Sequence, residues 1–234
     1  MRIPVASLSA LMLGPGTTIT HAAVKACTVC DTPVCWIGAD GMHFFAVGAA
    51  TSHDNERARL QAELASSSRT RDAVARKMFS MRFSDVDVSK YSVKELRGFE
   101  GRRVKRLYQE MGLKYGVSWK GRNYNQNNWD LADGINRAVS AANAALYALT
   151  TAVVTSMGYL PQLGFIHTAG VLPFVYDIAD IYKPITTLPA AFETLGMNQD
   201  ANEEDVVTQL KYYIEREKIL VRIPADIERL VSKS

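Results

Sequence analysis

Three side chains that can bind protons or metal ions lie in an otherwise apolar stretch, residues 164–180, which reads GFIHTAGVLPFVYDIAD. They are His167, Asp177 and Asp180. The two aspartates are three residues apart, so on a short helix they lie side by side along the edge of an apolar stripe formed by Phe174, Ile178 and Ile181. Two carboxylates held between core residues repel each other, because a low dielectric screens charge poorly. The pair therefore predicts a bound cation, although aspartates at this spacing are more often solvated.

A further carboxylate, Glu100, lies in the middle of a predicted helix, KELRGFEGRRVKRLYQEM. It interrupts an apolar stripe of helical spacing, so it is expected to point into the core; the stripe is Leu96, Val104, Leu107 and Met111. A buried carboxylate must meet a metal ion, a proton or strong donors, and an ion pair with a neighbouring arginine is the simpler alternative. Gly98 and Gly101 each disfavour a helix by about 1 kcal/mol relative to alanine. We therefore expect a backbone or a ligand to approach closely at these glycines.

Together, Glu100, His167, Asp177 and Asp180 offer three hard oxygen donors and one imidazole. This set suits Mg²⁺ or Mn²⁺, with water or phosphate oxygens completing the coordination shell. Zinc would want more nitrogen or sulfur, and a di-iron carboxylate site would need a glutamate three residues before His167, where the chain has Gly164. Taken alone, His167 is more often a hydrogen-bonded core histidine than a ligand.

A second candidate metal site consists of Cys27, Cys30 and Cys35, with His21 and His43 near enough in sequence to complete a zinc set. The second cysteine pair of a zinc ribbon is missing, and the flanking apolar residues are typical of buried strand; they are Val29, Val34 and Trp36. Three cysteines, an odd number, also argue against a disulfide framework. We therefore expect buried thiols in a cytoplasmic protein.

The elements that position these residues fall into two parts. Short apolar runs separated by Gly-Pro-Gly and Ala-Asp-Gly predict strands and one short helix up to about residue 48, and helical spacing begins at about residue 55. We predict an α+β protein with an N-terminal β-rich domain at residues 1–50 and a larger all-α catalytic domain at 51–234. The opening residues lack a convincing signal-peptide cleavage site, and the run 138–157 is mainly Ala, Ser and Thr, so no membrane association is expected.

The charge distribution is more informative than the formal net charge of +3. Basic residues dominate residues 97–122, whereas residues 190–205 carry acids and no base. This asymmetry fits a polyanionic partner, and a solvated helix face is the alternative.

Three segments resemble the CRISPR-associated integrases of the Cas1 family in its type I-E form. They read LRGFEGRRVKRLY, YGVSWKGRNYNQNNWDLADGINRAVSAANAALY and GYLPQLGFIHT…FVYDIADIYK, in family order and over nearly all of the chain. The resemblance implies an N-terminal β-domain followed by an α-helical catalytic domain. It also implies Glu100, His167, Asp177 and Asp180 as catalytic metal ligands for Mg²⁺ or Mn²⁺. The resemblance, rather than the spacing, is what selects His167.

By the same resemblance, the protein would insert new spacers into a CRISPR array. The 3′-hydroxyl of a short protospacer DNA would attack a phosphate in the CRISPR repeat. The implied partners are these DNAs, a second copy of the chain in a homodimer, and the Cas2 protein. Two alternatives stay open: a metal-dependent nuclease on branched or single-stranded DNA, with water as the nucleophile, and a non-catalytic DNA-binding assembly subunit.

Contacts with DNA are expected from basic and aromatic side chains near the catalytic set. Phosphate contacts are predicted for Arg97 and Arg122, with Lys183 as a weaker candidate, and stacking on bases for Tyr124 and Trp129. Tyr147 corresponds to another aromatic residue of the family near the active site. Core packing is the alternative for all three aromatic side chains.

Two features depart from the family pattern. Family members carry extra strands before the segment RIPVASLSALMLGPGT, so the β-domain is expected to be incomplete, with dimerisation weakened and a duplex-wedging tyrosine missing. Similar proteins also place a lysine shortly after the His-Thr pair, where this chain has Ala169, Gly170 and Val171. One phosphate contact is therefore expected to be lost.

Overall fold

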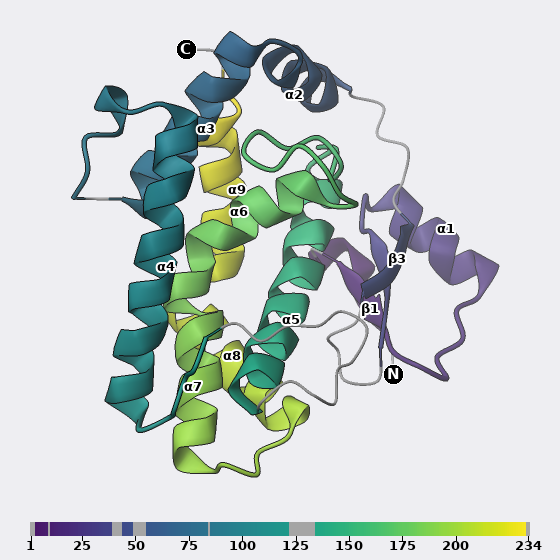
Figure 1. Cartoon of the computed structure of the whole chain (residues 1–234). Helices are drawn as coiled ribbons and strands as arrows, with labels where there is room; N and C mark the ends of the chain where they lie inside the picture. Colours follow the sequence, from purple (N-terminus) through teal and green to yellow (C-terminus); the bar gives the residue numbers. More distant parts are fainter. Residues whose placement is uncertain are drawn as a thin grey trace.

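The computed structural model describes residues 3–8, 10–38, 44–48, 55–83, 85–121 and 134–232. Most of these residues are helical, and a three-stranded sheet with one helix lies to one side of the helices (Figure 1). The predicted α+β fold, with strands first and helices after, is therefore confirmed. The predicted domain boundary between residues 50 and 51 lies outside the described residues, as do four candidate residues: His43, Arg122, Tyr124 and Trp129.

The N-terminal part is built on a small mixed sheet. Its elements are η1 (Val5–Ser7), β1 (Leu11–Leu13), α1 (His21–Val29), β2 (Val34–Ile37) and β3 (Phe44–Gly48). β1 runs parallel to β2 and β3 runs antiparallel to it. A parallel pair needs a crossover connection, which α1 supplies, and Thr20 caps this helix by accepting the Ala23 N–H.

The cysteines match the prediction only in part. Cys27 and Cys35 are buried, and burial raises the pKa of the Cys35 thiol to about 11. Cys30, however, is exposed, because it follows the last residue of α1. Val29, expected in a buried strand, is the exposed end of that helix, and Trp36, although in β2, is also exposed.

The helical part contains α2 (Glu56–Ser66), α3 (Ser68–Arg82), η2 (Val88–Lys90), α4 (Val93–Tyr115), α5 (Gly134–Ser156), α6 (Pro173–Tyr182), η4 (Lys183–Ile185), α7 (Thr187–Met197), α8 (Glu203–Arg216) and α9 (Ile219–Leu230). α5 is the central element and contacts α6, α7, α8 and α9 (Figure 1). By length and composition α5 could cross a membrane, but 61% of its most apolar window is buried among the other helices. It is thus a core helix of this fold.

α4 carries Glu100 and has well-defined ends. Ser92 and Glu95 form a reciprocal capping box at its start, and Gly116 ends it in the left-handed region at φ 68°. The close approach predicted at Gly98 and Gly101 is not made by the described part of the protein. A Cβ on Gly98 would come no nearer than 4.0 Å to Arg102, and one on Gly101 would meet nothing within 4 Å. The described backbone therefore does not supply the predicted approach, and an approach by a ligand stays a prediction.

Candidate active site

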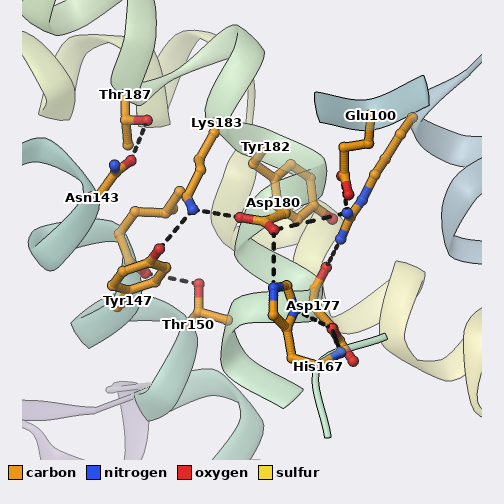
Figure 2. A network of polar contacts seen from close by, with 12 residues as sticks. Glu100, Asn143, Tyr147, Thr150, His167, Asp177, Asp180, Tyr182, Lys183 and Thr187 are labelled. Carbon is orange, nitrogen blue, oxygen red and sulfur yellow. Dashed lines mark hydrogen bonds and ion pairs between the residues drawn. The ribbon is translucent and has the colours of Figure 1, made fainter. Parts of the chain in front are cut away.

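A cleft of about 890 Å³ collects the predicted polar residues. Its walls include Glu100 of α4, Tyr147 of α5, His167 of the loop before α6, and Asp180 of α6. Figure 2 shows Asp180 in the middle of the network, between Lys183 on one side and Glu100 on the other. Residues from four segments that are far apart in sequence thus face one space.

Asp177 does not present a free oxygen to this cleft, because it is fully buried and holds the loop that carries His167. Its Oδ2 accepts the backbone N–H groups of Phe165 (2.6 Å) and Ile166 (3.0 Å). Its Oδ1 accepts the His167 backbone N–H (2.9 Å) and lies 2.7 Å from Nδ1 of the imidazole. A carboxylate has about four acceptor sites, so all are in use. This arrangement differs from the prediction that Asp177 is itself a metal ligand, and makes it a positioning residue for His167.

The contact with Asp177 also orients the imidazole. Nδ1 faces Asp177, whereas Nε2 is directed toward Asp180 and lies 4.0 Å from its Oδ2 (Figure 2). A carboxylate that fixes one imidazole nitrogen while the other faces a site is the usual arrangement behind metal-binding histidines.

Asp180 is balanced by two cationic side chains. Lys183 contacts its Oδ1, and Nη1 of Arg82 lies 3.8 Å from its Oδ2. Burial alone would raise the pKa of Asp180, but Lys183 and then Arg82 outweigh burial, so the pKa lies below its ordinary value. For Lys183, burial would lower the pKa, but Asp180 and then Tyr147 outweigh it and the pKa is raised. Both groups are therefore held in their charged forms.

Lys183 takes part in this network through two of its three donors, and its contact with a phosphate stays a prediction. Its ammonium donates to the hydroxyl of Tyr147 over 2.6 Å, in addition to the contact with Asp180. Tyr147 packs edge-to-face on Tyr176, with ring centroids 4.8 Å apart, and still lines the cleft. Arg97 is an exposed residue at the cleft wall, and its contact with a phosphate stays a prediction.

Arg82 at the end of α3 is a member of the site that sequence reasoning missed. Its Nη1 contacts Oε1 of Glu100, and its Nη2 donates to the Asp177 carbonyl over 2.6 Å. This is the arginine pair that was the simpler alternative for Glu100, but the arginine comes from another helix. A signal was present: Arg82 lies on the buried stripe of α3 formed by Ala75, Met78 and Phe79.

In this arrangement no three His, Cys, Asp or Glu side chains in the described part of the chain are grouped closely enough to hold a metal ion. Arg82 places a positive charge between two of the carboxylates, because its Nη1 contacts Oε1 of Glu100 and lies 3.8 Å from Oδ2 of Asp180. Glu100, Asp180 and Nε2 of His167 supply two carboxylates and one imidazole around one cleft. This donor set fits Mg²⁺ or Mn²⁺.

Comparison with known proteins gives consistent matches. The sequence model of the family "CRISPR associated protein Cas1" matches residues 85–219. The CRISPR-associated endonuclease Cas1 2 of Chlorobaculum tepidum is 37% identical over the whole of this chain and 79% of its own length. The crystal structure of a TtCas1–DNA complex superposes with a TM-score of 0.86 at 38% identity, covering 99% of this chain and 87% of that one.

A more distant structure shares the fold alone. It is a partial Cas6-RT-Cas1–Cas2 complex, matched over 83% of this chain and 67% of that one, with a TM-score of 0.54 at 16% identity.

Proposed function

The chain belongs to the Cas1 family of CRISPR-associated endonucleases and integrases, and we propose on this basis that it inserts new spacers into a CRISPR array as a metal-dependent DNA integrase. The motifs LRGFEGRRVKRLY and GFIHT further support a type I-E member. The single observation that carries the proposal is the convergence of Glu100, His167 and Asp180 on one cleft.

We assign the ligand role to Glu100, Asp180 and Nε2 of His167, and a positioning role to Asp177. A bound Mg²⁺ or Mn²⁺ would polarise the phosphoryl oxygen and stabilise the charge that develops on it. The chain's own part is to bring these donors together and to keep Nε2 facing the cleft, with Nδ1 held by Asp177. Arg82 balances the charge of Glu100, and Lys183 balances that of Asp180.

The proposed reaction is a transesterification without an energy-rich cofactor. The 3′-hydroxyl oxygen of the incoming DNA forms a bond to a phosphorus of the repeat, and its proton is released. The bond from that phosphorus to the 3′ oxygen of the repeat strand breaks, and the leaving oxygen takes up a proton. Arg97 at the cleft wall is a candidate contact for the phosphate backbone.

The proposed partners follow from the same family membership. The TtCas1 structure contains DNA, and the distant Cas6-RT-Cas1–Cas2 structure contains Cas2. We propose protospacer and repeat DNA, Cas2 and a second copy of this chain as partners, with the protein acting in the cytoplasm. A nuclease reaction at the same site, with water in place of the hydroxyl, is the second candidate, because the curated relative is named an endonuclease.

The test is strand joining by variants of two glutamates on the same helix. Glu100→Gln should abolish joining in Mn²⁺ while DNA affinity stays near that of the wild type, because a neutral amide is a poor ligand. Glu110→Gln is the matched control, since Glu110 is a solvent-exposed α4 residue, and it should join normally. Full joining by Glu100→Gln would reject the proposal, and cleavage without joined products in the wild type would favour the nuclease.

A further inference from the structure

Gln61 of α2 is a fully buried polar side chain outside the catalytic cleft. Its amide nitrogen donates to the backbone carbonyls of Leu160 (3.0 Å) and Leu163 (2.7 Å). Its amide oxygen accepts the backbone N–H of Leu160 over 2.8 Å. All of these partners belong to the loop between α5 and α6, which lies beside α2 (Figure 1). One side chain therefore ties a separate helix to the loop that leads to His167.

The same loop has a second anchor on the other side of Gly164. Asp177 holds the backbone N–H groups of residues 165–167, as described above. At Gly164 itself, a Cβ would lie 2.3 Å from the His167 carbonyl oxygen and 2.8 Å from backbone and side-chain carbons of Pro173. The chain is thus closely packed between the two anchors. A displacement of Leu163 should therefore also displace His167, because no free space lies between them.

A weaker contact supports the same anchor. Arg57, one turn before Gln61 on α2, donates to the Met157 carbonyl over 3.2 Å and pairs with Glu228 of α9 over 2.9 Å. Arg57 is about half exposed, so its ion pair contributes little. Of these two polar contacts, the buried amide of Gln61 is therefore the stronger link between α2 and the loop.

We propose that Gln61 is a positioning residue that sets the location of the His167 imidazole through the loop 160–166. The effect of Gln61 on metal binding rests on the proposed function, whereas its effect on the location of the imidazole does not. The competing possibility is that Gln61 stabilises the fold and leaves His167 where it is. Both possibilities predict a loss of stability when Gln61 is replaced, so stability alone does not separate them.

The experiment compares Gln61→Met with Gln209→Met in the full chain. Gln209 of α8 donates to Glu193 over 2.8 Å, far in sequence from the loop, and provides the same chemical change as a control. Three quantities are measured. The first is the unfolding midpoint; the other two, measured well below it, are the NMR signal of the His167 imidazole without metal and the Mn²⁺ affinity by EPR. The signal is assigned among the four histidines with His167→Gln.

Gln61→Met should shift the His167 signal and weaken Mn²⁺ binding by about tenfold, the low end of effects seen when a supporting hydrogen bond behind a ligand is removed. Gln209→Met should change neither. An unshifted His167 signal with wild-type Mn²⁺ affinity in Gln61→Met would overturn the inference. If Gln61→Met does not fold, Gln61→Glu keeps the acceptor for Leu160 N–H, loses the amide donor to both carbonyls, and is judged by the same criteria.

The two proposals fail separately. If the wild type binds no Mn²⁺ in the cleft, the proposed function fails. The His167 signal of the Gln61 variants then decides the positioning inference without reference to metal.

Discussion

At the scale of the residue, Asp177 and Asp180 lie three positions apart on α6 but have different surroundings. Asp177 is fully buried, with all of its acceptor sites occupied by the loop. The Asp180 side chain is 18% exposed, lines the cleft and meets Lys183 and Arg82. The difference in surroundings, rather than in residue type, separates a positioning carboxylate from a candidate ligand.

Asparagine at each position should therefore give two distinct outcomes. Asp177→Asn turns an amide group toward backbone N–H donors, which should lower the free energy of unfolding by about 1–3 kcal/mol. It should also weaken Mn²⁺ binding about 10- to 100-fold without abolishing it. Asp180→Asn should abolish detectable Mn²⁺ binding. Isothermal titration measures the Mn²⁺ affinity, and urea unfolding measures the free energy of unfolding. The assignment would be contradicted if Asp177→Asn lost Mn²⁺ binding while Asp180→Asn retained it.

The sequence indicated the acidic members of the site but not the groups that support them. Periodicity placed Glu100, Asp177 and Asp180 toward a core, and the family resemblance added His167. Arg82 lies on the buried stripe of α3, so a polar residue in the core was detectable there, whereas α2 buries only Ala65 besides Gln61. The partners of both side chains were not detectable, because the contacts join Arg82 to Glu100 and Gln61 to Leu163 across different helices.

At the scale of the element, α4 contains two glycines that no described protein atom requires. Both are exposed in a helix interior, where alanine is favoured over glycine. Gly101 lines the cleft, whereas Gly98 is not among the lining residues. Among the described residues nothing requires a glycine at position 101, and the approach of a ligand is the reason that we test.

Alanine at each glycine tests this reason. Gly98→Ala and Gly101→Ala should both raise the free energy of unfolding by about 0.5–1 kcal/mol, since each reduces the freedom of the unfolded chain. Only Gly101→Ala should weaken DNA binding, because its methyl group enters the cleft. Urea unfolding gives the free energy of unfolding, and fluorescence anisotropy with labelled DNA gives the DNA affinity. Equal DNA affinities for the two variants would show that Gly101 serves no ligand.

Local patterns also determined how well the elements could be predicted. The apolar runs before residue 48 contain β1, β2 and β3, and the short predicted helix became α1. The parallel pairing of β1 with β2 was not predictable, because it depends on how α1 crosses over the sheet rather than on either strand. The exposed Val29 was also not predictable, because apolar residues occur both at the end of a helix and in a strand.

At the scale of the whole molecule, the uneven charge matters more than the net charge of +3. The basic segment that begins at Arg97 runs along α4, and Arg97 and Lys105 line the cleft. The fold therefore places positive side chains beside the carboxylate site, where they can hold a phosphate backbone without contacting the proposed metal ligands.

DNA affinity should accordingly fall steeply with salt. For a single strand, the slope of log K against log salt is about −0.7 for each phosphate neutralised. Arg97→Gln should make this slope shallower by about one such increment, whereas the exposed Lys211→Gln on α8 should not. Anisotropy titrations between low and physiological salt provide the slopes. A flat dependence in the wild type would contradict the electrostatic account.

The division into a β-rich and an α-helical part was predictable because the hydrophobic period changes between residues 48 and 55. The small residues of α5 indicated that it is not a membrane span, but they did not indicate which helices surround it. Its position follows only from the contacts with α6, α7, α8 and α9, which surround it.

The central claim is that Glu100, Nε2 of His167 and Asp180 converge on one divalent ion. Anomalous diffraction from Mn²⁺-soaked crystals tests it directly. The claim predicts one strong Mn²⁺ peak in the cleft with these three side chains as its protein ligands, and with Asp177 still bonded to the loop backbone. A cleft without Mn²⁺, or an ion bound by Asp177 in place of Asp180, would contradict it.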